Sequence, residues 1–147
     1  MTDVSAAGGI LFRVNEEDEL QVLLIYRREV WDLPKGKKEN SETLEQCAVR
    51  EVSEEVGCPE PEILDELATT YHEYERDNEH YGKTTYWYAM QSDYGEPLHP
   101  QEEEGIEKIA WVSLKEAKKR VGYDNLREVL EKFDRWHRNR NGSDPGR

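Results

Sequence analysis

A predicted helix over Glu42–Val56 has one face that begins apolar and becomes acidic halfway along. Ser41 is the expected N-cap and Gly57 the expected terminator, because hydroxyl side chains cap helix N-termini and glycine readily adopts the left-handed conformation that ends helices. At about 100° per residue, the side that starts at Leu44 continues through three glutamates. These are Glu51, Glu54 and Glu55. A face that should be buried is therefore charged, and the charge needs a partner.

The three carboxylates lie at i, i+3 and i+4 and repel one another. Arg50 can reach Glu54 one turn away, but a single guanidinium cannot neutralise three acids. A divalent cation with oxygen ligands can do so, and the pattern therefore favours Mg²⁺ or Mn²⁺. Zinc is disfavoured because no histidine or thiolate pair at ligand spacing accompanies the glutamates. A solvated acidic helix face is the alternative that the glutamates alone leave open.

The surrounding segment fits the spacing G-x5-E-x7-R-E-U-x-E-E-x-G-U, in which U is aliphatic. The matching positions are Gly36, Glu42, Arg50, Glu51, Val52, Glu54, Glu55, Gly57 and Cys58. On these residues the chain resembles the Nudix hydrolases, with Cys58 a less usual choice at the last position. The resemblance implies an α/β fold, an α/β/α sandwich with a mixed β-sheet. It also implies metal-dependent hydrolysis of a phosphoanhydride bond in a nucleoside diphosphate-linked compound.

The resemblance implies a role for each polar residue of the motif. Residues matching Glu51, Glu54 and Glu55 are metal ligands or the base that activates water. The residue matching Gly36 often offers its backbone carbonyl to the metal, and the one matching Arg50 orients the glutamates by salt bridges. We expect Glu54 and Glu55 to be ligands and Glu51 to be a ligand or the base.

Basic residues flank the motif. Arg27 and Arg28 end a predicted strand, where they are either solvated or placed to bind phosphate. Lys35 and Lys37 lie in the stretch WDLPKGK, in which Gly36 is expected to form a tight turn. Lysines beside a metal-bearing helix suit a polyphosphate. The form LPKGK resembles Nudix members that act on diadenosine polyphosphates, diphosphoinositols and some mutator-type nucleotides.

A strand over Lys83–Met90 offers aromatic rings for stacking on a base. Its alternation puts Tyr86 and Tyr88 on one face and Trp87 on the other. We expect Trp87 in the core, whereas either core packing or base stacking fits the two tyrosines. Tyr74 falls where diadenosine polyphosphate hydrolases of the resembling family often carry a tyrosine.

A predicted loop over residues 95–105 ends in three acids, Glu102, Glu103 and Glu104. Acidic runs are usually solvated. Many Nudix enzymes, however, draw an extra metal ligand or base from a loop in this region, so the resemblance makes each of the three a candidate.

The remaining pattern alternates strands and helices, which predicts a mixed sheet with helices on both faces. Predicted strands cover Val4–Val14, Leu20–Arg27, Glu62–Tyr74, Lys83–Met90 and Ile106–Val112, with a charged loop over Glu75–Gly82. Capping boxes at Ser113 and Asn125 predict two further helices. We expect one domain over residues 1–140 and a disordered tail over 141–147.

The formal charge of −13 argues against a nucleic-acid polymer as partner, because phosphate backbones require a cationic surface. The longest aliphatic run, Val22–Ile25, is too short to span a bilayer. Cys47 and Cys58 lie roughly 16 Å apart along one helix, beyond disulfide reach, which fits a reducing compartment. The sequence thus predicts a cytoplasmic monomer or homodimer.

The leading substrate class is a dinucleoside polyphosphate, a small molecule rather than a polymer. A mutator-type hydrolase of oxidised nucleoside triphosphates is the second reading, and a diphosphoinositol polyphosphate hydrolase is the third. A non-catalytic nucleotide sensor is also possible, since Nudix folds can be kept for binding after the glutamates are lost. This chain keeps all of the motif acids.

Overall fold

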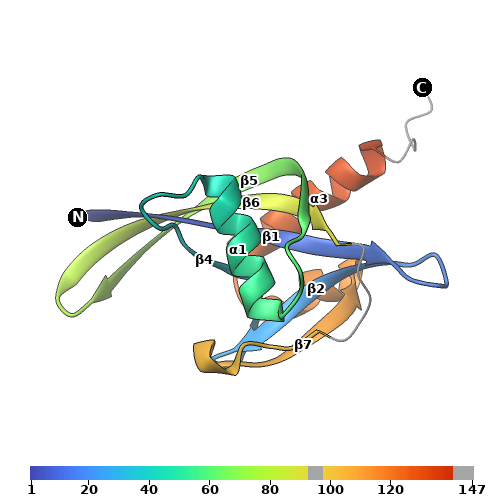
Figure 1. Ribbon diagram of the computed structural model, residues 1–147, viewed down its shortest axis with the longest axis horizontal. Coiled ribbons are helices and arrows are strands. Elements are labelled where there is room, and N and C mark those ends of the chain that lie inside the picture. The colour runs from blue at the N-terminus through green and yellow to red at the C-terminus, as the bar shows by residue number, and fades with distance from the viewer. Residues whose placement is uncertain (93–97, 141–147) are drawn as a thin grey trace.

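The computed structural model describes residues 1–92 and 98–140, which form one mixed β-sheet packed between helices (Figure 1). The strands are β1 (Thr2–Val14), β2 (Leu20–Arg27), β3 (Val30–Asp32), β4 (Lys35–Lys37), β5 (Glu62–Arg76), β6 (Glu79–Gln91) and β7 (Ile106–Ser113). The helices are α1 (Leu44–Val56), α2 (Leu114–Arg120) and α3 (Asp124–Arg140), with a 3-10 turn, η1, at Glu102–Glu104.

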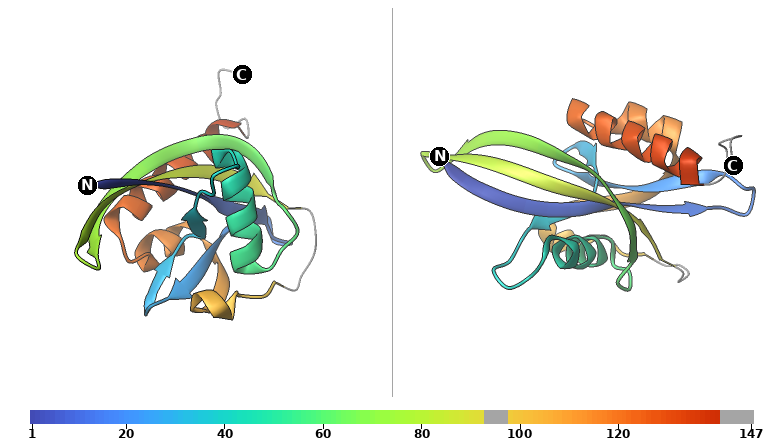
Figure 2. Two further views of the ribbon diagram at one scale, coloured as in Figure 1. Left: turned by 60° about the vertical axis from the view of Figure 1, so that its left-hand side comes forward. Right: turned by 90° about the horizontal axis from the view of Figure 1, so that it is seen from above.

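The main path of the sheet runs β3-β2-β1-β6-β5, with β4 added to β1 and β7 added to β2. The β1–β6 pair is parallel, and every other pairing among the described strands is antiparallel. Seen along the sheet, α1 covers one face and α2 with α3 covers the other (Figure 2). The predicted mixed sheet between helices is therefore confirmed.

Strand alternation divides the core between these two faces. On the α1 face, residues of β1, β2 and β6 pack against the apolar side of the helix, where Cys47, Ala48, Val52 and Val56 are buried. On the other face, Trp87 and Phe133 are among the buried residues that join the sheet to α2 and α3. Trp87 is thus a core residue, as its alternation predicts, and Cys47 and Cys58 are both buried and not joined by a disulfide.

The charged loop expected over Glu75–Gly82 is a strand hairpin instead. β5 and β6 pair continuously up to Arg76 and Glu79, and only Asp77 and Asn78 lie between the strands. Both turn residues have positive φ, 52° and 65°, which suits the two-residue turns that match strand twist. The hairpin therefore extends beyond the helices as an arm (Figure 1).

Two helix starts differ from those expected. Thr43, not Ser41, caps α1: its hydroxyl accepts from the Gln46 amide, and the Gln46 side chain accepts from the Thr43 amide. This reciprocal pair requires a Thr-x-x-Gln spacing, which Ser41 lacks. At the other end of the chain, α3 begins at Asp124, so Asn125 lies inside the helix.

The second predicted helix start agrees with the structure, and some predicted segments lie outside the described residues. Ser113 caps α2 by accepting from the Glu116 amide, as predicted. Helix α3 continues through Arg140. The tail over 141–147 and part of the predicted loop over 95–105 are not described. None of the described helices combines the length and apolarity needed to cross a membrane.

Candidate active site

The acidic half of α1 contacts strands β2 and β4, and Glu55 is its most buried acid. Glu55 is 2% exposed. Its Oε1 accepts the backbone N–H of Lys35 at 3.0 Å, and its Oε2 lies 3.3 Å from Arg27 Nη1. Burial raises the pKa of Glu55 to about 7, although the cations of Arg27 and Lys35 oppose the shift. The carboxylate thus joins α1 to both β2 and β4.

Glu51 lies against Gly36 of β4. A Cβ on Gly36 would overlap the Glu51 carboxyl group, so only glycine allows the strand to pass this close to the helix. Gly36 pairs with Ala7 of β1, and the tight turn predicted at this glycine is wrong. Its carbonyl accepts from Cys47 Sγ of α1 at 3.5 Å. Burial raises the pKa of Glu51, and contacts with Arg50 work in the opposite direction.

Arg50 contacts three of the motif acids and one backbone carbonyl. Its Nε and Nη2 donate to the Glu42 carboxylate at 3.0 and 2.7 Å. Its Nη1 lies 2.7 Å from Glu51 and 3.3 Å from Glu54. Nη2 also donates to the Lys37 carbonyl. These contacts lower the pKa of Glu42 to about 2. Glu42 precedes the helix rather than lying in its first turn, and this position frees it to form the fork–fork pair.

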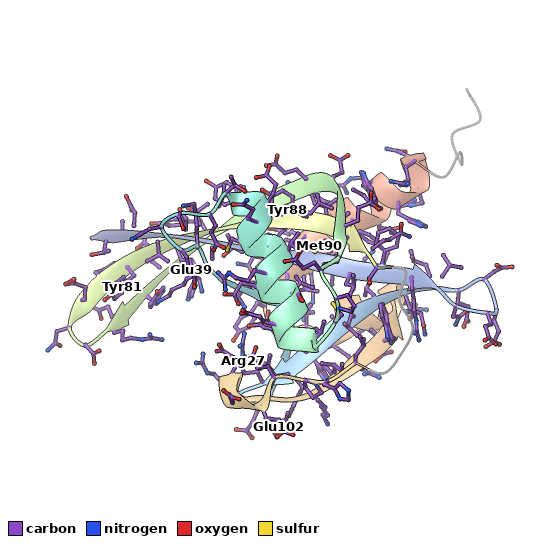
Figure 3. All side chains as sticks on the ribbon, viewed as in Figure 1. Arg27, Glu39, Tyr81, Tyr88, Met90 and Glu102 are labelled. Atoms are coloured by element: carbon purple, nitrogen blue, oxygen red, sulfur yellow. The ribbon has the colours of Figure 1, made fainter. Side chains whose placement is uncertain are left out.

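The three acids of η1 lie between the segment that contacts the end of α1 and the start of β7. All three are exposed. Glu104 is the member whose negative charge raises the pKa of Glu51. Backbone N–H groups of His99 and Gln101 donate to the last carbonyls of α1, which fixes η1 near the C-terminal end of that helix. Figure 3 shows Glu102 below Arg27 at this end. Glu104 is therefore the strongest candidate for the extra acid.

The predicted cations occupy different positions. Arg27 contacts Glu55, whereas Arg28 lies in the exposed two-residue turn between β2 and β3, with φ of 55°. Lys35 and Lys37 are on β4, opposite Gly8 and Ala6 of β1. The structure brings Arg27, Lys35 and Lys37 together and leaves Arg28 at the edge.

Lys83 is a site residue that sequence reasoning missed. This half-buried lysine of β6 lies within electrostatic reach of Arg27, Lys35 and Lys37, whose charges add to burial in lowering its pKa to about 8. We call these four residues the cationic cluster. Lys83 follows a charged segment along the chain, and no local pattern sets it apart. Its position depends on the β1–β6 pairing.

The aromatic residues separate by face of the sheet. Tyr88 is 3% exposed and packs with Met90 against α1 (Figure 3). Of the two alternatives left open for this tyrosine, its burial favours core packing, because a buried ring has no free face. Tyr86 is partly buried on the same side. Tyr74 pairs with Tyr81 in the hairpin arm, where their rings stack 5.1 Å apart, and Lys83 Nζ lies 5.7 Å from the Tyr74 ring.

The donor set fits a hard divalent cation, since Gly36, Glu51, Glu54 and Glu55 offer carboxylate and carbonyl oxygens only. Among residues 1–92 and 98–140, however, no three acidic, histidine or cysteine side chains converge as a preformed site. Arg50 holds Glu51 and Glu54, and Glu55 faces Arg27 and the Lys35 amide. To bind a metal ion, Glu51 and Glu54 would therefore have to release Arg50, and Glu55 would have to release Arg27 and the Lys35 amide.

Mg²⁺ or Mn²⁺ is expected to raise the melting temperature in proportion to the logarithm of its concentration above the dissociation constant. The reason is that the folded site binds the ion and the unfolded chain does not. Thermal unfolding followed by circular dichroism measures the shift. Ionic strength must be matched with NaCl, because any salt screens a net charge of −13. An equal shift in NaCl alone would show that no specific metal site exists.

Comparison with known proteins identifies the class. The family model described as the NUDIX domain matches residues 4–133. The chain belongs to the Nudix family, and divalent metal ions are the general cofactors of its hydrolases. A candidate mutator protein of Mycobacterium tuberculosis, MutT4, is 31% identical over 138 residues, which are 90% of this chain and 54% of that protein. The 8-oxo-(d)GTP phosphatase of Mycolicibacterium smegmatis is 28% identical over 149 residues, 88% of this chain and 41% of that protein.

Solved structures share the fold. A C. elegans Ap4A hydrolase in a binary complex superposes with a TM-score of 0.74 at 22% identity, covering 92% of this chain and 98% of that one. The NUDIX domain of Shewanella oneidensis NrtR, complexed with ADP ribose, gives 0.72 at 20% identity, covering 92% and 88%. The chain spans about half the length of the curated relatives it matches.

Proposed function

We propose that this chain hydrolyses a phosphoanhydride bond in a nucleotide-linked compound, with a dinucleoside polyphosphate as the leading substrate class. The observation that carries the proposal is the contact between two groups of opposite charge. The acids of α1 meet the cationic cluster at Glu55, which lies 3.3 Å from Arg27 Nη1 and also accepts the backbone N–H of Lys35. A protein of charge −13 repels a polyanion overall, so affinity has to come from these local cations.

The roles of the side chains follow from their environments. A bound divalent ion would supply charge neutralisation at the phosphoryl oxygens. Glu54 and Glu55 would hold it, together with Glu51 and the carbonyl of Gly36. Glu51 is the ligand or the base, and its burial raises its pKa, which suits a group that accepts a proton from water. Arg50 braces Glu51 against Glu42, fixing the direction of the carboxylate.

Base recognition falls to the hairpin arm in this proposal. Tyr74 and Tyr81 stack side by side next to Lys83, so a ring and an ammonium group lie together on one face of the sheet. Because every base has a π-face, stacking on these rings would tolerate different bases. Tyr86, partly buried on the α1 side, is a weaker candidate.

Among dinucleoside polyphosphates, kcat/KM is expected to rise with phosphate-chain length, since each added phosphate reaches further into the cationic cluster. Lys37→Ala should flatten this rise more than it weakens the shortest substrate, because it removes a contact that only longer chains reach. The measurement is kcat/KM of the wild type and of Lys37→Ala for dinucleoside polyphosphates of increasing phosphate-chain length. The reactions contain Mg²⁺, and chromatography resolves the products. Lys132→Ala, on α3, is the matched control. An unchanged slope in Lys37→Ala would exclude this lysine from binding.

Alkaline pH is expected to weaken the same reaction. Lys83 has a pKa lowered to about 8, so its ammonium loses its proton, and its attraction for phosphate, as pH rises through that value in the free protein. Lys83→Arg keeps the charge and should move the decline in kcat/KM to higher pH. The measurement is kcat/KM between about pH 7 and 10. Superimposed profiles for the two proteins would mean that Lys83 does not contact substrate.

The names of the curated relatives favour a second candidate, a mutator-type hydrolase of oxidised nucleoside triphosphates. The two readings separate in one substrate panel. A preference for 8-oxo-dGTP over all dinucleoside polyphosphates by about a hundredfold, roughly 2.7 kcal/mol, would replace the leading substrate class with this one. Failure to hydrolyse any nucleotide with Mg²⁺ or Mn²⁺ would leave a binding module.

A further inference from the structure

Asp32 is a buried acid for which neither the motif nor the proposed chemistry accounts. It ends β3 and is 7% exposed. Both of its oxygens are occupied: Oδ1 accepts the Leu33 backbone N–H at 2.7 Å, and Oδ2 lies 2.8 Å from Lys35 Nζ. Burying a carboxylate is costly unless such partners compensate it. An apolar residue at position 32 would avoid the desolvation cost of the carboxylate, so the charge of Asp32 calls for an explanation.

Lys35 connects this acid to the catalytic helix. Its backbone N–H donates to Glu55 Oε1 while its side chain pairs with Asp32. The Lys35 side chain is 19% exposed and that of Asp32 9%, so solvent screens the pair less than a surface ion pair. An ammonium group has three N–H donors. Asp32 takes one of them, and the others remain for oxygens of a ligand.

Asp32 also lies among charges that would otherwise repel one another. Lys35, Lys37 and Arg27 each lower the pKa of Lys83, whereas the negative charge of Asp32 raises it. The acid is thus close enough to both Lys35 and Lys83 to reduce their repulsion. Without it, the flexible side chain of Lys35 would move away from Lys83 toward solvent.

We propose that Asp32 is a positioning residue that acts through Lys35, holding the Lys35 ammonium beside Lys83 so that both bind one polyphosphate chain. The identity of the substrate rests on the proposed function, but the coupling between Asp32 and Lys35 does not. A simple charge effect has the opposite sign: removing an acid from a cationic cluster would tighten phosphate binding. The direction of the change therefore separates positioning from charge.

The test is a double-mutant cycle of Asp32→Asn and Lys35→Gln. Asparagine keeps the size of the side chain and an oxygen for the Leu33 amide, and it removes the charge that holds Lys35. Asp32→Asn is expected to raise KM for a dinucleoside tetraphosphate about tenfold and to change kcat less than about threefold. Lys35→Gln should raise KM by a similar factor. The KM of the double variant should be no higher than that of Lys35→Gln alone.

Binding of inorganic tripolyphosphate, measured by calorimetry on the same four proteins, gives a readout that does not need hydrolysis. Each single variant is expected to bind tripolyphosphate about tenfold more weakly than the wild type, and the double variant should bind no more weakly than Lys35→Gln. Asp134→Asn is the matched control, because it breaks an ion pair between Asp134 of α3 and Lys118 of α2. It should leave KM and the dissociation constant for tripolyphosphate unchanged. If the wild type binds tripolyphosphate but cleaves no nucleotide, the proposed function fails, and the cycle still decides the role of Asp32.

Three outcomes would overturn the proposal. Losses that multiply in the double variant would show that Asp32 and Lys35 act independently. Equal or tighter tripolyphosphate binding by Asp32→Asn would show that its charge, rather than its hold on Lys35, dominates. A lowered melting temperature with unchanged KM would give Asp32 a role in stability alone, which also contradicts the proposal.

Discussion

Glu54→Gln is expected to lower kcat by about a hundredfold or more while leaving the fold intact. The substitution removes the charge of a proposed metal ligand and keeps its size. Glu54 is half exposed and lies 3.3 Å from Arg50, a surface ion pair of small energetic value. The free energy of unfolding should therefore change by less than about 1 kcal/mol. It should rise if relief of repulsion within the acidic face dominates.

Steady-state kinetics at saturating Mg²⁺ and denaturant unfolding without metal measure the two effects separately. Glu45→Gln is the matched control, because Glu45 is an exposed acid in the first turn of the same helix. It should retain wild-type kcat. Near-wild-type turnover in Glu54→Gln would remove this residue from the active site, whatever happens to stability.

Gly36→Ala is expected to reduce activity by about a hundredfold through geometry alone. The new Cβ would overlap the Glu51 carboxyl group, so β4 and α1 must separate or Glu51 must rotate away from Arg50. Overpacking of this kind also costs about 1–3 kcal/mol of stability. Lys38→Ala is the control, because it truncates a side chain just beyond β4. It should change activity and stability little.

A second substitution makes the steric cause testable. Glu51→Asp shortens the side chain by one methylene and should restore part of the stability lost in Gly36→Ala, since the carboxyl group then withdraws from the added methyl group. Activity should not return, because the shortened acid no longer reaches its original position. Thermal unfolding of the two single variants and the double variant measures the coupling. Strictly additive stability losses would place the effect of Gly36→Ala elsewhere.

The acidic helix, the mixed sheet and most strand positions could be predicted from sequence because their signals are local. Strand β2 was predicted with its observed bounds, since a continuous apolar run ends at charged residues. The hairpin arm was missed although Asp77-Asn78 is a two-residue turn signal between alternating strands. Thr43 was likewise readable as the cap, because Gln46 completes its capping box.

Other site features depend on how distant segments pack. Alternation in β6 divides its residues into two faces, but it does not say which face α1 covers. The burial of Tyr88 could not be read from the strand alone. Lys83 belongs to the site because β6 pairs with β1, which also carries β4. Glu104 is distinguished from its two acidic neighbours by its electrostatic effect on Glu51, which depends on how η1 packs near α1.

The parallel pairing of β1 with β6 also determines when the molecule can fold. It joins residues 2–11 to residues 81–90, so the loop to be closed is about half of the chain and includes α1. Contacts this far apart in sequence slow folding, because loop closure must precede the gain from pairing. During synthesis the motif helix leaves the ribosome before the strand on which Tyr88 and Met90 support it. The glutamates therefore acquire their arrangement late, in a cooperative step shared with the whole sheet.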